Sequence, residues 1–98
     1  MFKVNYSHSA NAEIVDILRY IKQFSAERAL SYVKGLDERI QELIKDPYIG
    51  RPAQEEYDIP NSRIIYFKSH KIIYCVSEQT ETINIEVIIH NKKDHKSY

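Results

Sequence analysis

Two amphipathic helical patterns that follow each other almost without a linker constrain this chain most. The first pattern repeats apolar residues at helical spacing, through Ile14, Ile17, Leu18, Ile21 and Phe24. The second continues over a longer stretch, through Ala29, Leu30, Val33, Leu36, Ile40, Leu43 and Ile44. Because only Phe24 and Ser25 separate the two patterns, we expect an antiparallel helical hairpin whose apolar stripes face the same way.

Residues at the ends of both patterns suit helix boundaries. Ser7 or Ser9 can cap the first helix and Ser25 the second, since a serine hydroxyl accepts a hydrogen bond from an amide of the first turn. The second helix is expected to end near Asp46, because Pro47 disfavours a helical conformation in the residue before it.

Four strand-like segments can cover the apolar face of the hairpin. Residues 2–6 (FKVNY) alternate apolar and polar side chains, and three later segments, SRIIYFK, KIIYCVSE and INIEVIIH, are rich in Ile, Val, Tyr and Phe. Residues 46–61, which hold all three prolines, are predicted to form an irregular connection. The expected fold is an α+β domain of order β-α-α-β-β-β, with the helical hairpin packed on one face of a mostly antiparallel sheet.

Alternate side chains of the last strand are expected to point to opposite faces of the sheet. The helix-facing set should be Ile83, Ile85, Val87 and Ile89. The opposite set should be Asn84, Glu86, Ile88 and His90. His90 is therefore expected on the face away from the core, either as a contact or catalytic residue or as an ordinary surface histidine.

Composition excludes several classes of function. The 98 residues suffice for one domain, which we assign to residues 1–98. Lys and Arg number 14, as do Asp and Glu, so the molecule as a whole has no charge excess that would attract nucleic acid or an anionic membrane. Neither a secretory leader nor an apolar run of about 18 residues is apparent, which predicts a cytoplasmic protein without membrane contact.

The sequence also lacks the usual signatures of a cofactor or metal site. A single cysteine, Cys75, allows neither an internal disulfide nor a cysteine-based zinc site, and we expect it to be a structural residue. No phosphate-binding loop, metal-ligand spacing or Ser/His/Asp arrangement is present, so no cofactor and no metal are expected.

Basic residues gather near the end of the sequence, at Lys92, Lys93 and Lys96, with His90 and His95 adding charge at low pH. Others precede them in the predicted strands and can join them in space, at Arg63, Lys68 and Lys71. This local group can be a contact surface. The alternative is a solvated chain terminus without a role.

Three segments in this order, DPYIGRP, SRIIYFKSHKIIYCV and IEVIIHNKKD, resemble the RelE/ParE superfamily of bacterial type II toxins, and most of all its ParE-like plasmid-stabilisation branch. The resemblance rests on a helix ending at Asp46–Pro47, a Gly50–Arg51 turn, Arg63 at the start of a strand, the basic-aliphatic-Tyr strand 71–74, and His90 before basic residues and Asp94. It spans nearly the whole chain and implies the β-α-α-β-β-β fold together with a toxin that a cognate antitoxin holds inactive.

The resemblance implies two alternative targets. ParE-like toxins bind DNA gyrase and trap it on cleaved DNA, which requires a contact surface and no catalytic group in the toxin. The ribosome-dependent RNases of the superfamily cut mRNA, and they place an Arg where Lys71 stands, another near Lys93, and a Tyr like Tyr98. A lysine is a point charge without the forked geometry that suits a phosphorane, so gyrase is the favoured target. A degenerate toxin or a simple binding module is a third possibility.

Expected site residues follow from these alternatives. For gyrase the target-binding residues are expected to be Arg63, His90, Lys92, Lys93 and Lys96. For the RNase the catalytic residues would be Lys71, Lys93 and Tyr98. Leu30 and Val33 are expected to line an apolar groove for an antitoxin segment that folds on binding.

Overall fold

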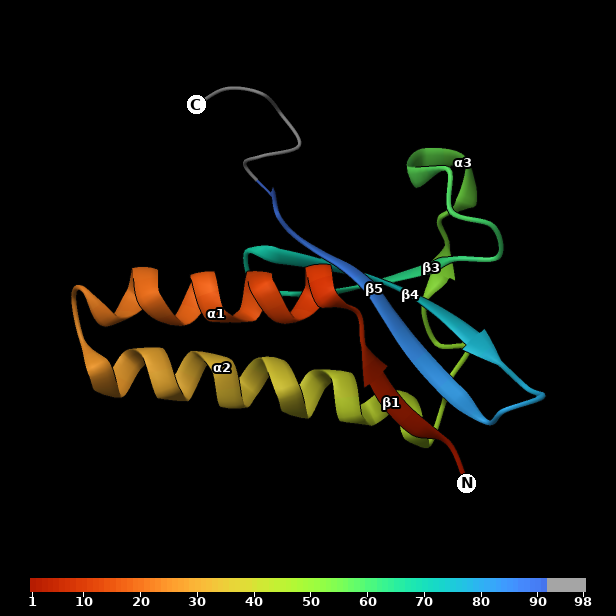
Figure 1. Cartoon of the computed structure of the whole chain (residues 1–98), viewed down its shortest axis with the longest axis horizontal. Helices are drawn as coiled ribbons and strands as arrows, with labels where there is room; N and C mark the ends of the chain where they lie inside the picture. Colours follow the sequence, from red (N-terminus) through yellow and green to blue (C-terminus); the bar gives the residue numbers. More distant parts are fainter. Residues whose placement is uncertain (92–98) are drawn as a thin grey trace.

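A computed structural model describes residues 1–91 of the chain, in which two long helices pack across one face of a five-stranded sheet (Figure 1). The elements follow in the order β1 (Lys3–Tyr6), α1 (His8–Lys22), α2 (Ala26–Gln41), the 3-10 turn η1 (Glu42–Ile44), β2 (Arg51–Pro52), α3 (Gln54–Tyr57), β3 (Arg63–Phe67), β4 (His70–Ser77) and β5 (Thr82–His90). The predicted α+β class and the helical hairpin are confirmed.

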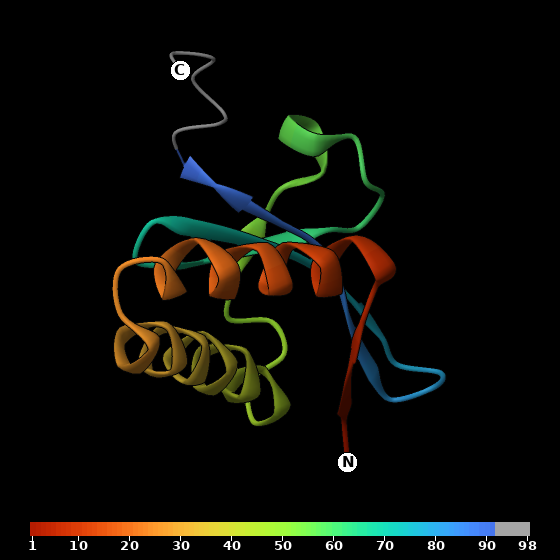
Figure 2. The same cartoon turned by 60° about the vertical axis from the view of Figure 1, so that its left-hand side comes forward.

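The sheet is mixed and mostly antiparallel, with strand order β1-β5-β4-β3-β2. Only β1 and β5 run parallel, and the pairs β5/β4, β4/β3 and β3/β2 are antiparallel. Figure 2 shows β1 running beside β5, at the sheet edge opposite to β2. Among residues 1–91 the first and last strands are therefore neighbours. The first helix begins beside β5, since the amide of its cap residue Ser7 donates to the carbonyl oxygen of Ile85 at 3.0 Å.

Serine caps begin both helices. The hydroxyl of Ser7 accepts a hydrogen bond from the amide of Ala10 at 2.9 Å, and the hydroxyl of Ser25 accepts one from the amide of Arg28 at 3.1 Å. Of the two predicted caps for the first helix, Ser7 is thus the one used. The second helix ends at Gln41 and continues as η1 to Ile44, two residues before the predicted end near Asp46.

The connection of residues 46–61 contains two elements that the sequence did not predict. Arg51 and Pro52 pair with Ile64 and Arg63 and add a fifth strand, and α3 follows directly. Pro52 lacks an amide hydrogen, but β2 is an edge strand, where proline is tolerated. The prediction of an irregular connection was therefore wrong for these residues.

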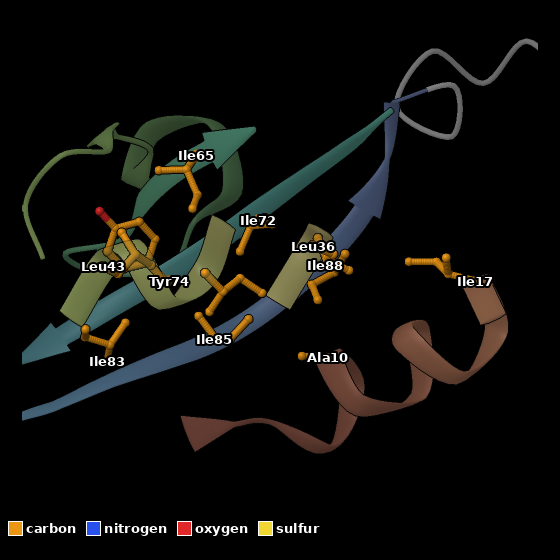
Figure 3. Packing of buried hydrophobic residues seen from close by; sticks show 11 residues of the cluster. Ala10, Ile17, Leu36, Leu43, Ile65, Ile72, Tyr74, Ile83, Ile85 and Ile88 are labelled. Atoms are coloured by element: carbon orange, nitrogen blue, oxygen red, sulfur yellow. The ribbon is translucent and has the colours of Figure 1, made fainter. Parts of the chain in front are cut away.

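The main core lies between the helices and the sheet. Figure 3 shows its buried side chains converging from α1, α2, η1 and three strands, among them Ala10, Ile17, Leu36, Leu43, Ile65, Ile72, Tyr74, Ile83, Ile85 and Ile88. Burying a large apolar side chain contributes roughly 1.5–3 kcal/mol, so this cluster supplies most of the driving force for folding. A smaller cluster covers the other face of the sheet, where Ala53, Ile64 and Ile73 pack with Tyr57, Ile59, Val87 and Ile89.

A β-bulge in β5 reverses the predicted facing of its last residues. Ile73 pairs with Val87 while Tyr74 pairs with Ile85, so Glu86 has no partner on β4. Because a bulge inserts one extra residue, the alternation of side chains shifts by one beyond it. The predictions for residues 87–90 were therefore wrong. Val87 and Ile89 join the smaller cluster, Ile88 joins the main core, and His90 turns to the helix-facing side, where it borders the same cavity as Ile17 of α1.

Within residues 1–91, no helix combines the length and the apolar character that crossing a bilayer requires.

Candidate functional site

Apart from Arg63 at the start of β3, the predicted site residues that the structure describes fall into three separate regions of the molecule. Leu30 and Val33 lie between the two helices, Lys71 lies on the sheet face away from the helices, and His90 lies on the helix-facing side. Lys92, Lys93, Lys96 and Tyr98 lie outside the described residues.

The first region is a hollow of about 440 Å³ between α1 and α2, which we call the hairpin groove. Its apolar wall consists of Ile14, Leu18, Leu30, Val33, Leu36 and Ile40, and its polar end is formed by Tyr6, Lys34 and Asp37. Leu30 is 66% exposed, whereas Val33 is partly buried against the main core. Both residues line an apolar groove as expected, but only the Leu30 side chain is largely exposed to solvent.

At the polar end of the hairpin groove, Tyr6 donates a hydrogen bond to Oδ1 of Asp37 at 2.9 Å. Burial and the neighbouring Asp37 carboxylate both raise the pKa of the Tyr6 hydroxyl well above its usual value. This bond connects β1 to α2 and fixes one end of the groove.

The second region, which we call the outer strip, consists of Arg51, Glu56, Tyr66 and Lys71. Tyr66 and Lys71 are directly opposite each other in the β3/β4 ladder. Nη2 of Arg51 donates to the hydroxyl of Tyr66 at 2.7 Å, and Nη1 of Arg51 pairs with the carboxylate of Glu56 at 2.5 Å. The guanidinium is thus engaged on two sides, and the Glu56 bond raises the pKa of Arg51 further.

Arg63 lies at the far end of the β3/β4 hairpin from His90. It pairs with Tyr74 in the middle of β4, whereas His90 pairs with His70 at the start of that strand. Nη1 of Arg63 donates to the carbonyl oxygen of Gly50 at 2.6 Å and to that of Tyr48 at 3.3 Å. Its guanidinium carbon also stands 5.2 Å from the centre of the Tyr48 ring. The structure therefore does not bring Arg63 together with His90.

The third region is a hollow of about 640 Å³ between the C-terminal half of α1, the start of α2 and the β3–β4 turn, which we call the histidine cavity. His70 is buried and shares a hydrogen bond of 2.8 Å between its Nδ1 and the hydroxyl of Tyr32. The rings of His70 and His90 meet edge to face, with centroids 5.0 Å apart. Burial raises the pKa of Tyr32, so this hydroxyl stays protonated at neutral pH.

Lys71 and His90 stand on neighbouring strands but on opposite faces of the sheet, since Lys71 pairs with Ile89 and not with His90. Neither residue is without contacts, and both interact with other groups of the chain. Within residues 1–91, no three His, Cys, Asp or Glu side chains are grouped so as to hold a metal ion. Only Lys71 of the expected RNase residues can be placed, and it lies beside Tyr66 in the outer strip.

Sequence reasoning missed two features of these regions. The run Val87, Ile88, Ile89 has no polar residue at any position, and this break in alternation was the available signal that both faces are buried there. The contact between Arg51 and Tyr66 left no such signal, because it depends on a two-residue strand whose pairing partner is set by the fold.

Comparison with known proteins identifies the family of this chain. The family described as the ParE toxin of the type II toxin-antitoxin system, parDE, matches residues 4–95. Among curated proteins, no sequence matches the chain closely enough to count as a relative.

Solved structures share the fold. The chromosomal ParDE toxin-antitoxin system from P. aeruginosa superimposes with a TM-score of 0.74 at 20% identity, covering 92% of this chain and 96% of that chain. The RelBE2 complex from Mycobacterium tuberculosis gives 0.58 at 15% identity, covering 90% and 95%. The intact E. coli RelBE complex gives 0.57 at 13% identity, covering 90% and 94%. With a family match that spans almost the whole domain, the chain belongs to the ParE toxin family of type II toxin-antitoxin systems.

Proposed function

We propose that this chain arrests bacterial growth by binding DNA gyrase and that a cognate antitoxin neutralises it. The observation that carries the choice of target is the engagement of the arginines near the β3/β4 hairpin. Arg51 is held by Glu56 and Tyr66, and Arg63 is held by the carbonyl oxygens of residues 48 and 50. Both guanidinium groups have internal structural roles.

An RNase active site needs forked cationic donors that are free to meet the charge developing on the phosphorane. The outer strip offers Lys71 beside Tyr66, and the Arg51 guanidinium that bonds the Tyr66 hydroxyl is already paired to the carboxylate of Glu56. A gyrase poison needs only a contact surface, because the enzyme itself cuts and rejoins DNA. The geometry of the described residues therefore suits a surface that contacts gyrase better than it suits an RNase active site.

The proposed gyrase contact includes His90 and the basic residues Lys92, Lys93 and Lys96 that follow β5. Basic side chains at the rim of an interface act mainly on encounter and register. If Arg63 also takes part, it does so at a separate place, because it pairs with Tyr74 whereas His90 pairs with His70, at the start of β4.

The hairpin groove is the proposed antitoxin site. It is apolar along both helices and has the exposed Leu30 at its edge, which suits the apolar stripe of a segment that becomes helical on binding. The solved relatives from M. tuberculosis and E. coli are themselves toxin–antitoxin complexes. A partner that folds in the groove would bury side chains that the isolated chain leaves in water.

Expression in bacteria tests the choice of target. With gyrase as the target, induction of the chain switches on a DNA-damage reporter, deletion of residues 92–98 abolishes the signal, and Lys71→Ala retains it. Co-expression of the antitoxin should silence the signal in each case. Growth arrest without the reporter signal, lost in Lys71→Ala, would instead establish the RNase alternative.

A further inference from the structure

The histidine cavity is the larger hollow of the two, and the proposed function assigns it no role. At about 640 Å³ it falls within the size range of sites that enclose a ligand or a few side chains. Its apolar floor comes from Ile17, which is buried, and from the partly buried Ile21. Tyr20 stands at its border and is 65% exposed. A segment entering here would cover apolar surface that is now in contact with water.

The α1 border of the cavity is acidic. Glu13 and Asp16 are three residues apart and therefore lie on the same side of the helix. Among residues 1–91 neither carboxylate has an ion-pair partner. Arg28 contributes the opposing charge from α2, across the cavity. Arg19 follows Asp16 by three residues on the same helix, but it does not line the cavity. A basic segment in the cavity would therefore meet two carboxylates and no cation among the α1 residues that line it.

The chain leaves β5 at the mouth of this cavity. His90 and Ser69 both line it, and the amide of Asn91 donates to the carbonyl oxygen of Ser69 at 2.8 Å. The next residues are Lys92 to Tyr98, with the sequence KKDHKSY. Seven extended residues reach about 23–25 Å, whereas the helix from Glu13 to Tyr20 covers about 10 Å. The segment is therefore long enough to pass the whole acidic border.

We propose that residues 92–98 dock into the histidine cavity, with their lysines against Glu13 and Asp16 and Tyr98 on the apolar floor. The charge of the segment is opposite to that of the α1 border, and its aromatic residue matches the floor beside Tyr20. The contact is reversible, because ion pairs at an open surface are weak and screened by salt. While docked, these basic residues cannot contact a target protein. Only this effect on target binding rests on the proposed function; the docking itself does not.

Zero-length carbodiimide coupling of the full chain tests the docking directly. The reagent joins a lysine amine to a carboxylate only when the two groups are in contact. We expect coupling of Lys92, Lys93 or Lys96 to Glu13 or Asp16, and none to Glu38 or Glu55, which are exposed but do not line the cavity. The yield should fall in 1 M salt, where the Debye length shrinks from about 8 Å to about 3 Å. Equal coupling to all four carboxylates would overturn the proposal.

A second measurement does not depend on coupling chemistry. A spin label on Ser97→Cys, in a Cys75→Ser background, should broaden amide signals of residues 13–21, and the double variant Glu13→Gln/Asp16→Asn should remove the broadening. The matched variant Glu38→Gln/Glu55→Gln should leave it in place. Broadening that also appears when labelled chains are mixed with unlabelled isotope-enriched chains would mean docking between copies and would overturn the proposal, as would an absence of broadening. No gyrase is present, so failure here leaves the proposed target untouched.

Discussion

The hydroxyl of Tyr74 accepts a hydrogen bond of 3.0 Å from the amide of Gly50, which places the side chain of a central strand against the backbone of the turn before β2. The same hydroxyl donates to the carbonyl oxygen of Pro47 at 2.7 Å. Tyr74 is fully buried, so one phenol satisfies a donor and an acceptor that water cannot reach easily. This pairing holds the turn that positions Arg51 in the outer strip and gives Arg63 its carbonyl partners.

Removing the Tyr74 hydroxyl should destabilise the protein without changing its shape. Tyr74→Phe leaves the amide of Gly50 unpaired in the interior, so the free energy of unfolding in urea should fall by about 1–3 kcal/mol. Tyr66→Phe is the matched control, because that ring is 43% exposed and water can replace the lost bond. The control should cost about 0.5 kcal/mol or less. Similar losses in the two variants would contradict the role given to Tyr74.

The two glycines should respond in different ways to alanine. A Cβ at Gly50 would stand 2.7 Å from the carbonyl oxygen of Ile64 and 2.7 Å from the Tyr74 hydroxyl, and the backbone atom cannot move aside. Gly50→Ala should therefore lower the free energy of unfolding by about 1–3 kcal/mol. At Gly35 the near atom is Cζ of the Phe67 ring at 2.8 Å, which can shift, and alanine favours the helix by about 1 kcal/mol. Gly35→Ala should change the stability less than Gly50→Ala, and the reverse order would be evidence against this packing.

Alkaline pH should destabilise the protein through three tyrosines, of which Tyr74 is buried and Tyr6 and Tyr32 are partly buried. Burial raises the pKa values of Tyr6, Tyr32 and Tyr74 above their unfolded value of about 10. Because the folded pKa is the higher one, this contribution to stability is fully present below pH 10 and is lost as the pH rises through the folded values. Urea unfolding should show falling stability above about pH 10. Tyr74→Phe should reduce that slope, and an unchanged slope would show that Tyr74 does not contribute to it.

The antitoxin site can be tested at a residue whose change leaves the fold intact. Leu30 is 66% exposed and lines the hairpin groove, so Leu30→Asp should weaken antitoxin binding by about tenfold or more with little change in melting temperature. Ser31→Asp introduces the same charge one residue further, at an exposed position that does not line the groove, and should bind normally. Calorimetric titration compares the two variants. Equal affinities would place the antitoxin elsewhere. Val33→Asp is less informative, because Val33 also packs against the core.

The helical part of this fold was predictable because its signals are local. Apolar spacing and the serine caps at Ser7 and Ser25 act within a few residues, so they can be read without knowing the partners. The bulge at Glu86 depends on how β5 pairs with β4, and its effect reversed the expected position of His90. β2 was missed for the same reason, since two residues that include Pro52 become a strand only through their pairing with β3.

The candidate site was predictable to a smaller extent. Leu30 and Val33 line a groove as expected, because their helical spacing places them on one flank of α2. The basic residues were expected to gather in one place, but the register separates Arg63 from His90 and the sheet separates His90 from Lys71. The pairing between strands decides these positions. A single sequence gives only indirect information on that pairing.

Purified gyrase gives the most direct test of the proposed target. The chain is mixed with gyrase, ATP and supercoiled plasmid, the reaction is stopped with denaturant, and linear plasmid covalently attached to the enzyme is measured. We predict that this cleaved species accumulates with increasing toxin, that prior addition of the antitoxin prevents it, and that the chain without residues 92–98 fails to produce it. Plasmid that remains intact at every toxin concentration, while programmed ribosomes show toxin-dependent cuts in their mRNA, would contradict the proposal.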